Sequence, residues 1–360
     1  MGLHELRLVD FRLFQELSFQ PDRDAITVLL SPNGTGKTSL LEAVYALATA
    51  SSFRTSAASD MIRAGQGASE VHGVLFQRER RIQVDLTLTR GVRNTTKRML
   101  VNGQRPKSRA DVAEVLPLTV FTPEGVDIVR QGPENRRLFV TNLLTDVDPT
   151  TGDVIERFAR ILSQRNALLR ALAGERPTLS QESELDVWTT DFCAVSVELV
   201  TLRKSLLHDV APLVANYYHE LAHDDSRVEV AYEQSWSGDL FDALRDAFTD
   251  DRFRGHTTIG PQRDDVALLL DRRDTRRQAS QGEQRSLALA LRLAGHELVQ
   301  QRRGVDPLLL LDDVFSELDP LRSDRLLHLL PTGQTLVTTA SPLPSGMSPA
   351  AVIDLTKLKT

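Results

Sequence analysis

Apolar and polar positions in the first hundred residues predict several strands around one helix. Residues 6–11 come close to alternation, and the apolar run 25–30 is typical of a buried strand. Segment 37–50 spaces its apolar residues as a helix does. Three β-favouring segments follow, at 71–76, 82–88 and 98–101. The Asn102-Gly103 pair after the last segment predicts a tight hairpin turn.

The middle of the chain changes to a helical pattern. Residues 155–172 and 185–206 both carry apolar side chains at alternating spacings of three and four. Gly, Glu, Arg and Pro at 174–177 separate them, which suggests an antiparallel helical hairpin. An ordinary packed helix pair in a small lobe explains the same pattern equally well.

The last hundred residues return to mixed structure. The pattern predicts strands at 266–270, 308–311 and 335–338, and a helix at 284–302. We therefore expect an α/β lobe interrupted by a mostly helical second lobe. The expected domains are 1–125 and 257–360 for the two parts of the α/β lobe, and 126–256 for the helical insertion.

Composition limits the class of protein. The chain has 360 residues, of which 41% are hydrophobic and 26% charged, values typical of a globular protein with a sizeable core. A single cysteine, Cys193, excludes an intramolecular disulfide and indicates a reducing compartment. Without a signal-peptide pattern or a bilayer-length apolar stretch, we expect a cytoplasmic, nucleoid-associated location and no membrane partner.

Charge is unevenly distributed along the chain. The formal net charge is −6, which by itself does not suggest a nucleic-acid partner. Segment 78–109 nevertheless contains ten basic side chains and only two acidic ones, Glu79 and Asp85. Such a basic segment on an acidic protein favours contact with a polyanion, and we expect phosphate contacts there. A solvated, hairpin-rich face is the alternative.

A phosphate-binding loop is predicted between the first apolar strand and the first helix. Gly34 and Gly36 permit backbone N–H groups to turn inward, and the following helix N-terminus adds positive potential. We expect Lys37 to reach the β- and γ-phosphates and Thr38 to ligate Mg²⁺. The expected ATP-binding residues of this loop are Ser31, Pro32, Asn33, Gly34, Thr35, Gly36, Lys37 and Thr38.

Two carboxylates follow a second apolar strand. Residues 308–311 are all leucine, and Asp312 and Asp313 come next. We expect Asp312 to hold Mg²⁺ and Asp313 to orient or deprotonate the attacking water. An aspartate after a buried strand is common, so the prediction depends on its combination with the phosphate-binding loop.

The segment 280–286 introduces the last long helix. Ser280 and Glu283 have the spacing of a capping box. The same geometry offers a hydroxyl and the N–H of Gly282 to an anion at a helix N-terminus. We therefore expect Ser280 and Gly282 to contact a γ-phosphate as well.

Together these motifs resemble the ABC-type ATPases and, among them, the RecF family. The matching segments run nearly end to end, at 10–12, 31–42, 101–103, 121–124, 132–137, 163–166, 260–265, 282–293 and 309–319. The resemblance implies an ABC-type P-loop ATPase lobe with a short SMC-like helical arm. It also implies that Arg12 lies near the nucleotide base.

Further expectations follow from the same resemblance. It implies an ATP-dependent homodimer in which Ser280 and Gly282 of one copy face the loop of the other. The implied partners are duplex DNA, single-strand/double-strand junctions and RecR, with RecO, in the loading of RecA. The implied activity is weak, DNA-stimulated hydrolysis of ATP to ADP and phosphate, with catalytic roles for Lys37, Ser280, Asp312 and Asp313.

Three residues or segments depart from the family pattern. Ser31 stands in place of glycine, Gln262 in place of histidine, and Ala50-Ser51 in place of Gly-Arg. If position 31 needs a left-handed backbone, serine there reduces ATP affinity. The alternatives are a P-loop kinase, a transporter-type ATPase subunit and a nearly non-hydrolysing structural DNA clamp.

Overall fold

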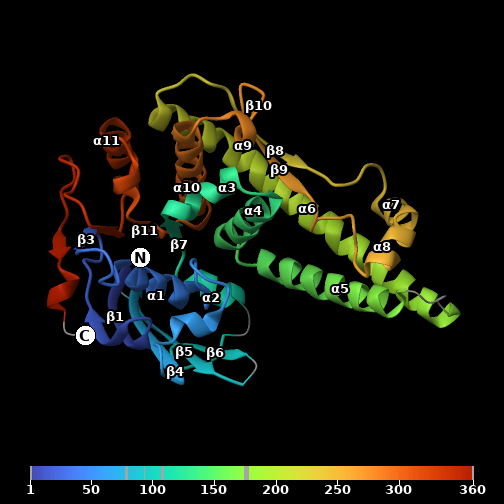
Figure 1. Ribbon diagram of the computed structural model, residues 1–360, viewed down its shortest axis with the longest axis horizontal. Helices are drawn as coiled ribbons and strands as arrows, with labels where there is room; N and C mark the ends of the chain where they lie inside the picture. Colours follow the sequence, from blue (N-terminus) through green and yellow to red (C-terminus); the bar gives the residue numbers. More distant parts are fainter. Residues whose placement is uncertain (1, 78–79, 93, 107–108, 174–177, 359–360) are drawn as a thin grey trace. The chain divides into compact units, whose positions relative to one another are not determined.

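The computed structural model describes the chain except residues 1, 78–79, 93, 107–108, 174–177 and 359–360, together with the side chains of residues 109, 110 and 113. Internal contacts divide it into two compact units (Figure 1). The first unit contains residues 1–126, 217–224 and 288–360. The second unit contains residues 127–216 and 225–287.

The first unit contains an antiparallel sheet of five strands in the order β2-β1-β4-β5-β6. Its strands are β1 (Gly2–Phe11), β2 (Phe14–Phe19), β4 (Ala68–Gln77), β5 (Arg80–Arg90) and β6 (Thr95–Val101). Alternation is clearest in β5, where Ile82, Val84, Leu86 and Leu88 are all buried. One face of the sheet therefore belongs to the core, as antiparallel sheets allow.

The second sheet of this unit is parallel, in the order β13-β3-β12-β11-β7. Its strands are β3 (Ile26–Leu30), β7 (Leu118–Phe121), β11 (Leu308–Asp312), β12 (Thr335–Thr339) and β13 (Ala351–Ile353). Every residue of β11 and β12 is buried, which explains the continuous apolar run of β11, while β12 combines aliphatic residues with buried threonines. Helix α1 (Lys37–Thr49) contacts strands of both sheets, so one core joins them.

Short elements complete the first unit. They are α2 (Arg109–Val115), α11 (Pro320–Leu329) and the 3-10 turns η1 (Ala58–Met61), η2 (Pro123–Val126), η3 (Val314–Glu317) and η4 (Leu355–Lys357). The predicted Asn102-Gly103 turn is confirmed: both residues have positive φ, and Val101 pairs with Gln104. The pairing is an isolated bridge, so among the described residues β6 is the last strand of this antiparallel sheet.

The second unit is mostly helical. Its helices are α3 (Asp127–Arg130), α4 (Pro133–Val147), α5 (Thr151–Ala171), most of α6 (Leu179–Ala222), α7 (Leu240–Asp246), α8 (Phe248–Arg254), α9 (Thr275–Gln278) and the start of α10 (Gln281–Arg303). A small sheet in the order β10-β9-β8 accompanies them, formed by β8 (Val228–Glu233), β9 (Asp265–Leu270) and β10 (Arg273–Asp274).

Helices α5 and α6 form the predicted antiparallel hairpin. Phe158 stacks on Phe192 with ring centroids 5.5 Å apart, while the later Arg165 reaches back to the earlier Thr189. The order of these contacts reverses along the two helices, which makes them antiparallel. The linking residues 174–177 lie outside the described residues.

Arg165 is the polar residue of the hairpin's apolar seam. Its side chain is 1% exposed and forms an ion pair of 2.9 Å with the fully buried Asp251. It also donates to Thr257 at 2.6 Å. The side chain is therefore part of the internal packing of the second unit.

The predicted domain boundaries stay predictions. The contact-based division begins the second unit at residue 127 and groups residues 257–287 with it. Strand β9 accounts for much of that grouping because it pairs with β8 along its whole length.

Candidate nucleotide site

The predicted phosphate-binding loop occupies the turn between β3 and α1. Gly34 and Gly36 have φ angles of 82° and 98°, a left-handed conformation that glycine adopts without strain. A Cβ atom on Gly36 would lie 2.6 Å from Cζ of Phe14. Glycine is therefore required at position 36 both by backbone conformation and by space. The first N–H groups of α1 follow directly, as an anion site needs.

Ser31 has an ordinary backbone conformation, so the premise that this position needs left-handed geometry is not met. Its hydroxyl donates to Asp354 Oδ1 at 3.1 Å and accepts from the backbone N–H of Leu355 at 2.9 Å. The serine side chain thus fastens the start of the loop to the segment after β13. Its presence gives no structural reason for a weaker nucleotide site.

Lys37 is buried at the first position of α1. Its Nζ donates to the carbonyl of Pro32 at 2.9 Å and to that of Ser31. Burial lowers the pKa of the Lys37 amine, and the nearby charges of Asp313 and Asp312 oppose that shift. The amine therefore lies beside the loop and near both carboxylates.

Asp312 ends β11 and is only 5% exposed. Its Oδ1 accepts from Thr38 Oγ1 at 2.9 Å and from Thr338 Oγ1 at 2.6 Å. Burial raises the pKa of the Asp312 carboxyl, while the two hydroxyl hydrogen bonds lower it. Residues 274 positions apart meet here because β3, β12 and β11 are parallel neighbours whose carboxyl ends lie at one edge.

The oxygen atoms of Thr38 and Asp312 fit a magnesium ion. Mg²⁺ in nucleotide sites is typically held by one or two protein oxygens, with water and phosphate oxygens completing the octahedron. A hydroxyl and a carboxylate already in hydrogen-bond contact form such a pair. The described residues contain no group of three or more His, Cys, Asp or Glu side chains suited to a metal, so additional ligands must come from elsewhere.

Asp313 adopts a left-handed backbone conformation with φ of 49°. Its N–H is held by Thr338, at 3.1 Å from the carbonyl and 3.0 Å from the hydroxyl oxygen. Its Oδ1 is buried, and among the described residues nothing donates a hydrogen bond to it. A non-glycine residue held in this conformation is typical of functional sites, where it aims a side chain.

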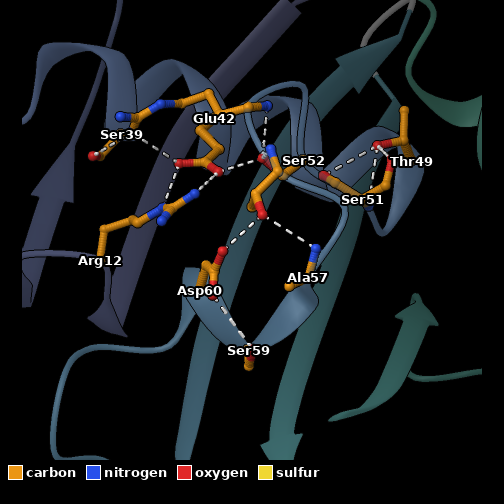
Figure 2. A network of polar contacts seen from close by, with 11 residues as sticks. Arg12, Ser39, Glu42, Thr49, Ser51, Ser52, Ala57, Ser59 and Asp60 are labelled. Carbon is orange, nitrogen blue, oxygen red and sulfur yellow. Dashed lines mark hydrogen bonds and ion pairs between the residues drawn. The ribbon is translucent and has the colours of Figure 1, made fainter. Parts of the chain in front are cut away.

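Arg12 forms a bidentate ion pair with Glu42, a fully buried carboxylate on α1 (Figure 2). The two Arg12–Glu42 distances are 2.7 and 2.5 Å, and the Arg12 backbone is left-handed with φ of 54°. Arg54 reaches the same carboxylate at 3.5 Å, and the Ser52 hydroxyl donates to it. Glu42 thus links Arg12 to the loop that follows α1.

Glu42 and Thr338 were not identified from the sequence as site residues. Glu42 follows Thr38 by one helical turn and is a charged residue among the apolar positions of α1, which is a detectable signal. Thr338 lies in a buried strand of threonine and aliphatic residues, and its role depends on the order of strands in the sheet. No local pattern reveals it.

Ser280 and Glu283 form the predicted capping box at the start of α10. The Ser280 N–H donates to Glu283 Oε2 at 2.6 Å, and the Glu283 N–H donates to Ser280 Oγ at 3.2 Å. These contacts lower the pKa of the Glu283 carboxyl. The predicted capping box is confirmed. Gly282 lies in the first turn of α10, beside the exposed Ser280. The contact with a phosphate stays a prediction.

The basic segment 78–109 lies mainly on β5 and β6. Its exposed side chains among the described residues are Arg80, Arg81, Arg90, Lys97, Arg98 and Arg105. Arg78, Glu79, Arg93, Lys107 and the side chain of Arg109 lie outside the described residues. Arg90 also donates to the carbonyl of Ser59.

No helix in the described part of the chain combines the length and apolar character needed to cross a bilayer.

Comparisons with known proteins agree on one family. Residues 2–343 match the model of the RecF/RecN/SMC N-terminal domain. The chain is 33% identical over 354 residues to a DNA replication and repair protein RecF of Acidothermus cellulolyticus, with 95% of this chain and 94% of that protein covered. It is 35% identical to the protein of that name from Streptomyces avermitilis, with 95% of this chain and 94% of that protein covered.

Solved structures show the same fold. The recombination mediator protein RecF in its ATP form, described as part of the RecFOR pathway, aligns with a TM-score of 0.88 at 24% identity, over 99% of this chain and 97% of that one. The Smc head domain of Pyrococcus furiosus aligns with a TM-score of 0.50 at 15% identity. The alignment covers 94% of this chain and 90% of that one. These likenesses confirm the predicted α/β, ABC-type ATPase fold with a helical arm.

Proposed function

The chain belongs to the RecF family, and on that premise we propose that it is an ATP-dependent DNA-binding clamp of recombinational repair and replication restart. Its relatives named RecF are DNA replication and repair proteins. The single observation that carries the proposal is the contact of Thr38 with Asp312, which joins the phosphate-binding loop to the carboxylate strand.

The site residues have distinct roles in this proposal. Lys37 leaves the loop carbonyls to bind the β- and γ-phosphates, and Arg12, fixed by Glu42, lies near the base. Thr38 and Asp312 would hold Mg²⁺, which neutralises phosphate charge when it is bound. Asp313 accepts a proton from, or orients, the attacking water through its buried carboxylate.

The second half of each nucleotide site comes from another copy of the chain. Ser280 and Gly282 at the N-terminus of α10 contact the γ-phosphate bound to the loop of the partner copy. Each charge-assisted hydrogen bond contributes about 1.5–3 kcal/mol, so hydrolysis and phosphate loss weaken the dimer. ATP binding closes the clamp and slow hydrolysis reopens it.

The ligand of the closed dimer is duplex DNA or a single-strand/double-strand junction. The exposed basic residues of β5 and β6 supply phosphate contacts. In the pathway the protein acts with RecR and RecO to promote loading of RecA.

Sedimentation velocity tests the clamp directly. The chain should be a monomer alone and a dimer with Mg²⁺ and a slowly hydrolysed ATP analogue, and Ser280→Arg should remain monomeric while still binding nucleotide. Ser180→Arg, which places the same charge on an exposed serine of α6, is the matched control and should dimerise normally. A nucleotide-bound chain that never dimerises contradicts the composite site.

A further inference from the structure

A groove of about 620 Å³ in the second unit is lined by residues of α6 and β8. It is lined by seven residues, Lys204, Leu207, His208, Ala211, Pro212, Val230 and Tyr232. The residues from α6 recur at spacings of three and four, so they form one face of that helix. The proposed ATP and DNA contacts use none of these residues.

The apolar face of the small sheet continues into this groove. Val230 and Tyr232 of β8 lie opposite Leu268 and Val266 of β9 in the antiparallel register. The two β9 residues are 5% and 4% exposed, whereas the two β8 residues are only half-buried. The apolar side chains of the middle strand, β9, are therefore fully buried, whereas those of β8 are only partly covered.

Strand β8 lies at the edge of its sheet among the described residues. An edge strand presents backbone N–H and C=O groups on its outer side and so can pair with another strand. The six residues of β8 carry Glu229 and Glu233 on the face opposite Val230 and Tyr232. Acidic side chains therefore do not point to the same face as the groove-lining residues of β8.

Hydrogen bonds hold the Tyr232 side chain at the floor of the groove. The Tyr232 hydroxyl donates a hydrogen bond to Asp264, which is 1% exposed. It also accepts one from Arg203 at 3.4 Å. A preformed surface of this kind binds a partner with less ordering cost.

The charge at the groove indicates the partner's chemistry. Lys204 and His208 are exposed on α6 and both line the groove. Lys204 contacts Gln234 and lies 6.0 Å from the Tyr232 ring centroid, so its charge is held beside the apolar floor. A carboxylate on the partner complements this end of the groove.

We propose that the groove between α6 and β8 docks an extended segment of a protein partner. The segment pairs with β8 as an added strand, places alternate apolar side chains over Leu207, Ala211 and Pro212, and sets one carboxylate near Lys204 and His208. The docking is independent of the proposed ATP-dependent clamp, because no residue that lines the groove takes part in the proposed nucleotide, dimer or DNA contacts.

A library of random ten-residue peptides displayed on phage, selected on the full chain, tests this docking. Enriched peptides should share apolar residues at every second position and one Asp or Glu. A synthetic copy of the best peptide should slow hydrogen exchange of backbone amides in 228–233. Lys204→Glu should raise its Kd at least tenfold, and Ala211→Arg, which fills the groove, should abolish binding.

Lys357→Glu reverses an exposed lysine in the first unit and serves as the matched control with unchanged Kd. Thermal unfolding of each variant establishes that it is folded. The proposal is overturned by a selection without a shared pattern, by peptides that bind both groove variants as tightly as the parent chain, or by exchange protection that spares β8.

Discussion

One ammonium group and two carboxylates lie close together at the carboxyl edge of the parallel sheet. They belong to Lys37, Asp312 and Asp313. Burial lowers the pKa of the Lys37 amine and raises that of the Asp312 carboxyl, so both charged forms are poorly solvated. Binding of a phosphate and a cation relieves this cost for both groups. The residue-level structure is therefore suited to a nucleotide with its metal ion.

Asp313→Asn tests the proposed role of this carboxylate. The amide keeps the size of the side chain but cannot accept a proton, so we expect ATP turnover to fall by about 10²–10⁴-fold. Nucleotide-dependent dimerisation should persist because Lys37, Thr38 and Asp312 are intact. Steady-state phosphate release and sedimentation of the same sample measure both effects, and unchanged turnover rejects the assignment.

His296 provides a pH dependence of stability. It lies on α10, 1% exposed, with Nδ1 3.1 Å from Thr119 Oγ1, and burial lowers its pKa from 6.5 to about 4. Between these values the unfolded chain binds a proton that the folded chain does not. The free energy of unfolding therefore falls as pH decreases from about 6.5 to 4.

His296→Gln removes this titration. From pH 7.5 to pH 5 the parent chain should lose about 2 kcal/mol more stability than the variant, as measured by urea unfolding. Equal losses in the two proteins would mean that His296 binds its proton as readily in the folded chain as in the unfolded one.

At the scale of elements, a buried ion pair fixes the hairpin of α5 and α6 to α8. Asp251 is fully buried and accepts from Arg165 at 2.9 Å and from the Thr258 N–H at 2.7 Å. The pair connects α5 to the end of α8 and to the residues after it. Arg165 therefore serves the packing of the second unit.

Asp251→Ala leaves the Arg165 charge buried without its carboxylate. We expect a loss of about 3–5 kcal/mol in the free energy of unfolding. Asp242→Ala removes an exposed ion pair with Arg245 in the same unit and should cost about 0–1 kcal/mol. Urea denaturation followed by circular dichroism compares the two variants, and equal small losses would show that the buried pair contributes little.

At the scale of the whole molecule, the proposed clamp depends on contacts between copies and with DNA. Arg98 lies opposite Thr87 in the antiparallel register and shares with Arg81 the face of the sheet opposite the buried Leu88. These exposed side chains present a positively charged surface on that face. Such a surface binds phosphates through charge and not through sequence.

Salt dependence measures that surface. If the dimer neutralises 6–10 phosphates, affinity for duplex DNA should fall by about 10³–10⁵ between 50 and 200 mM salt. Arg81→Ala with Arg98→Ala should reduce the slope of log affinity against log salt by about two for each copy that contacts DNA. Fluorescence anisotropy with a labelled duplex gives the slope, and a flat response removes this surface from the proposal.

Local patterns in the sequence predicted most elements and singled out the main residues of the candidate site. Near-alternation predicted β1, continuous apolar runs predicted β3 and β11, and 3/4 spacing predicted α5 and α6, because burial periodicity follows directly from backbone geometry. The phosphate-binding loop and the capping box were found because their residues are adjacent in the chain.

The tertiary structure decided which distant residues meet. The order β13-β3-β12-β11-β7 brings Thr338 to Asp312, and the pairing of Arg12 with Glu42 crosses 30 residues. The half-covered face of β8 likewise exists only because α6 passes beside it. Such contacts carry no periodic signal, since they depend on the packing of elements whose separation along the chain is not encoded locally.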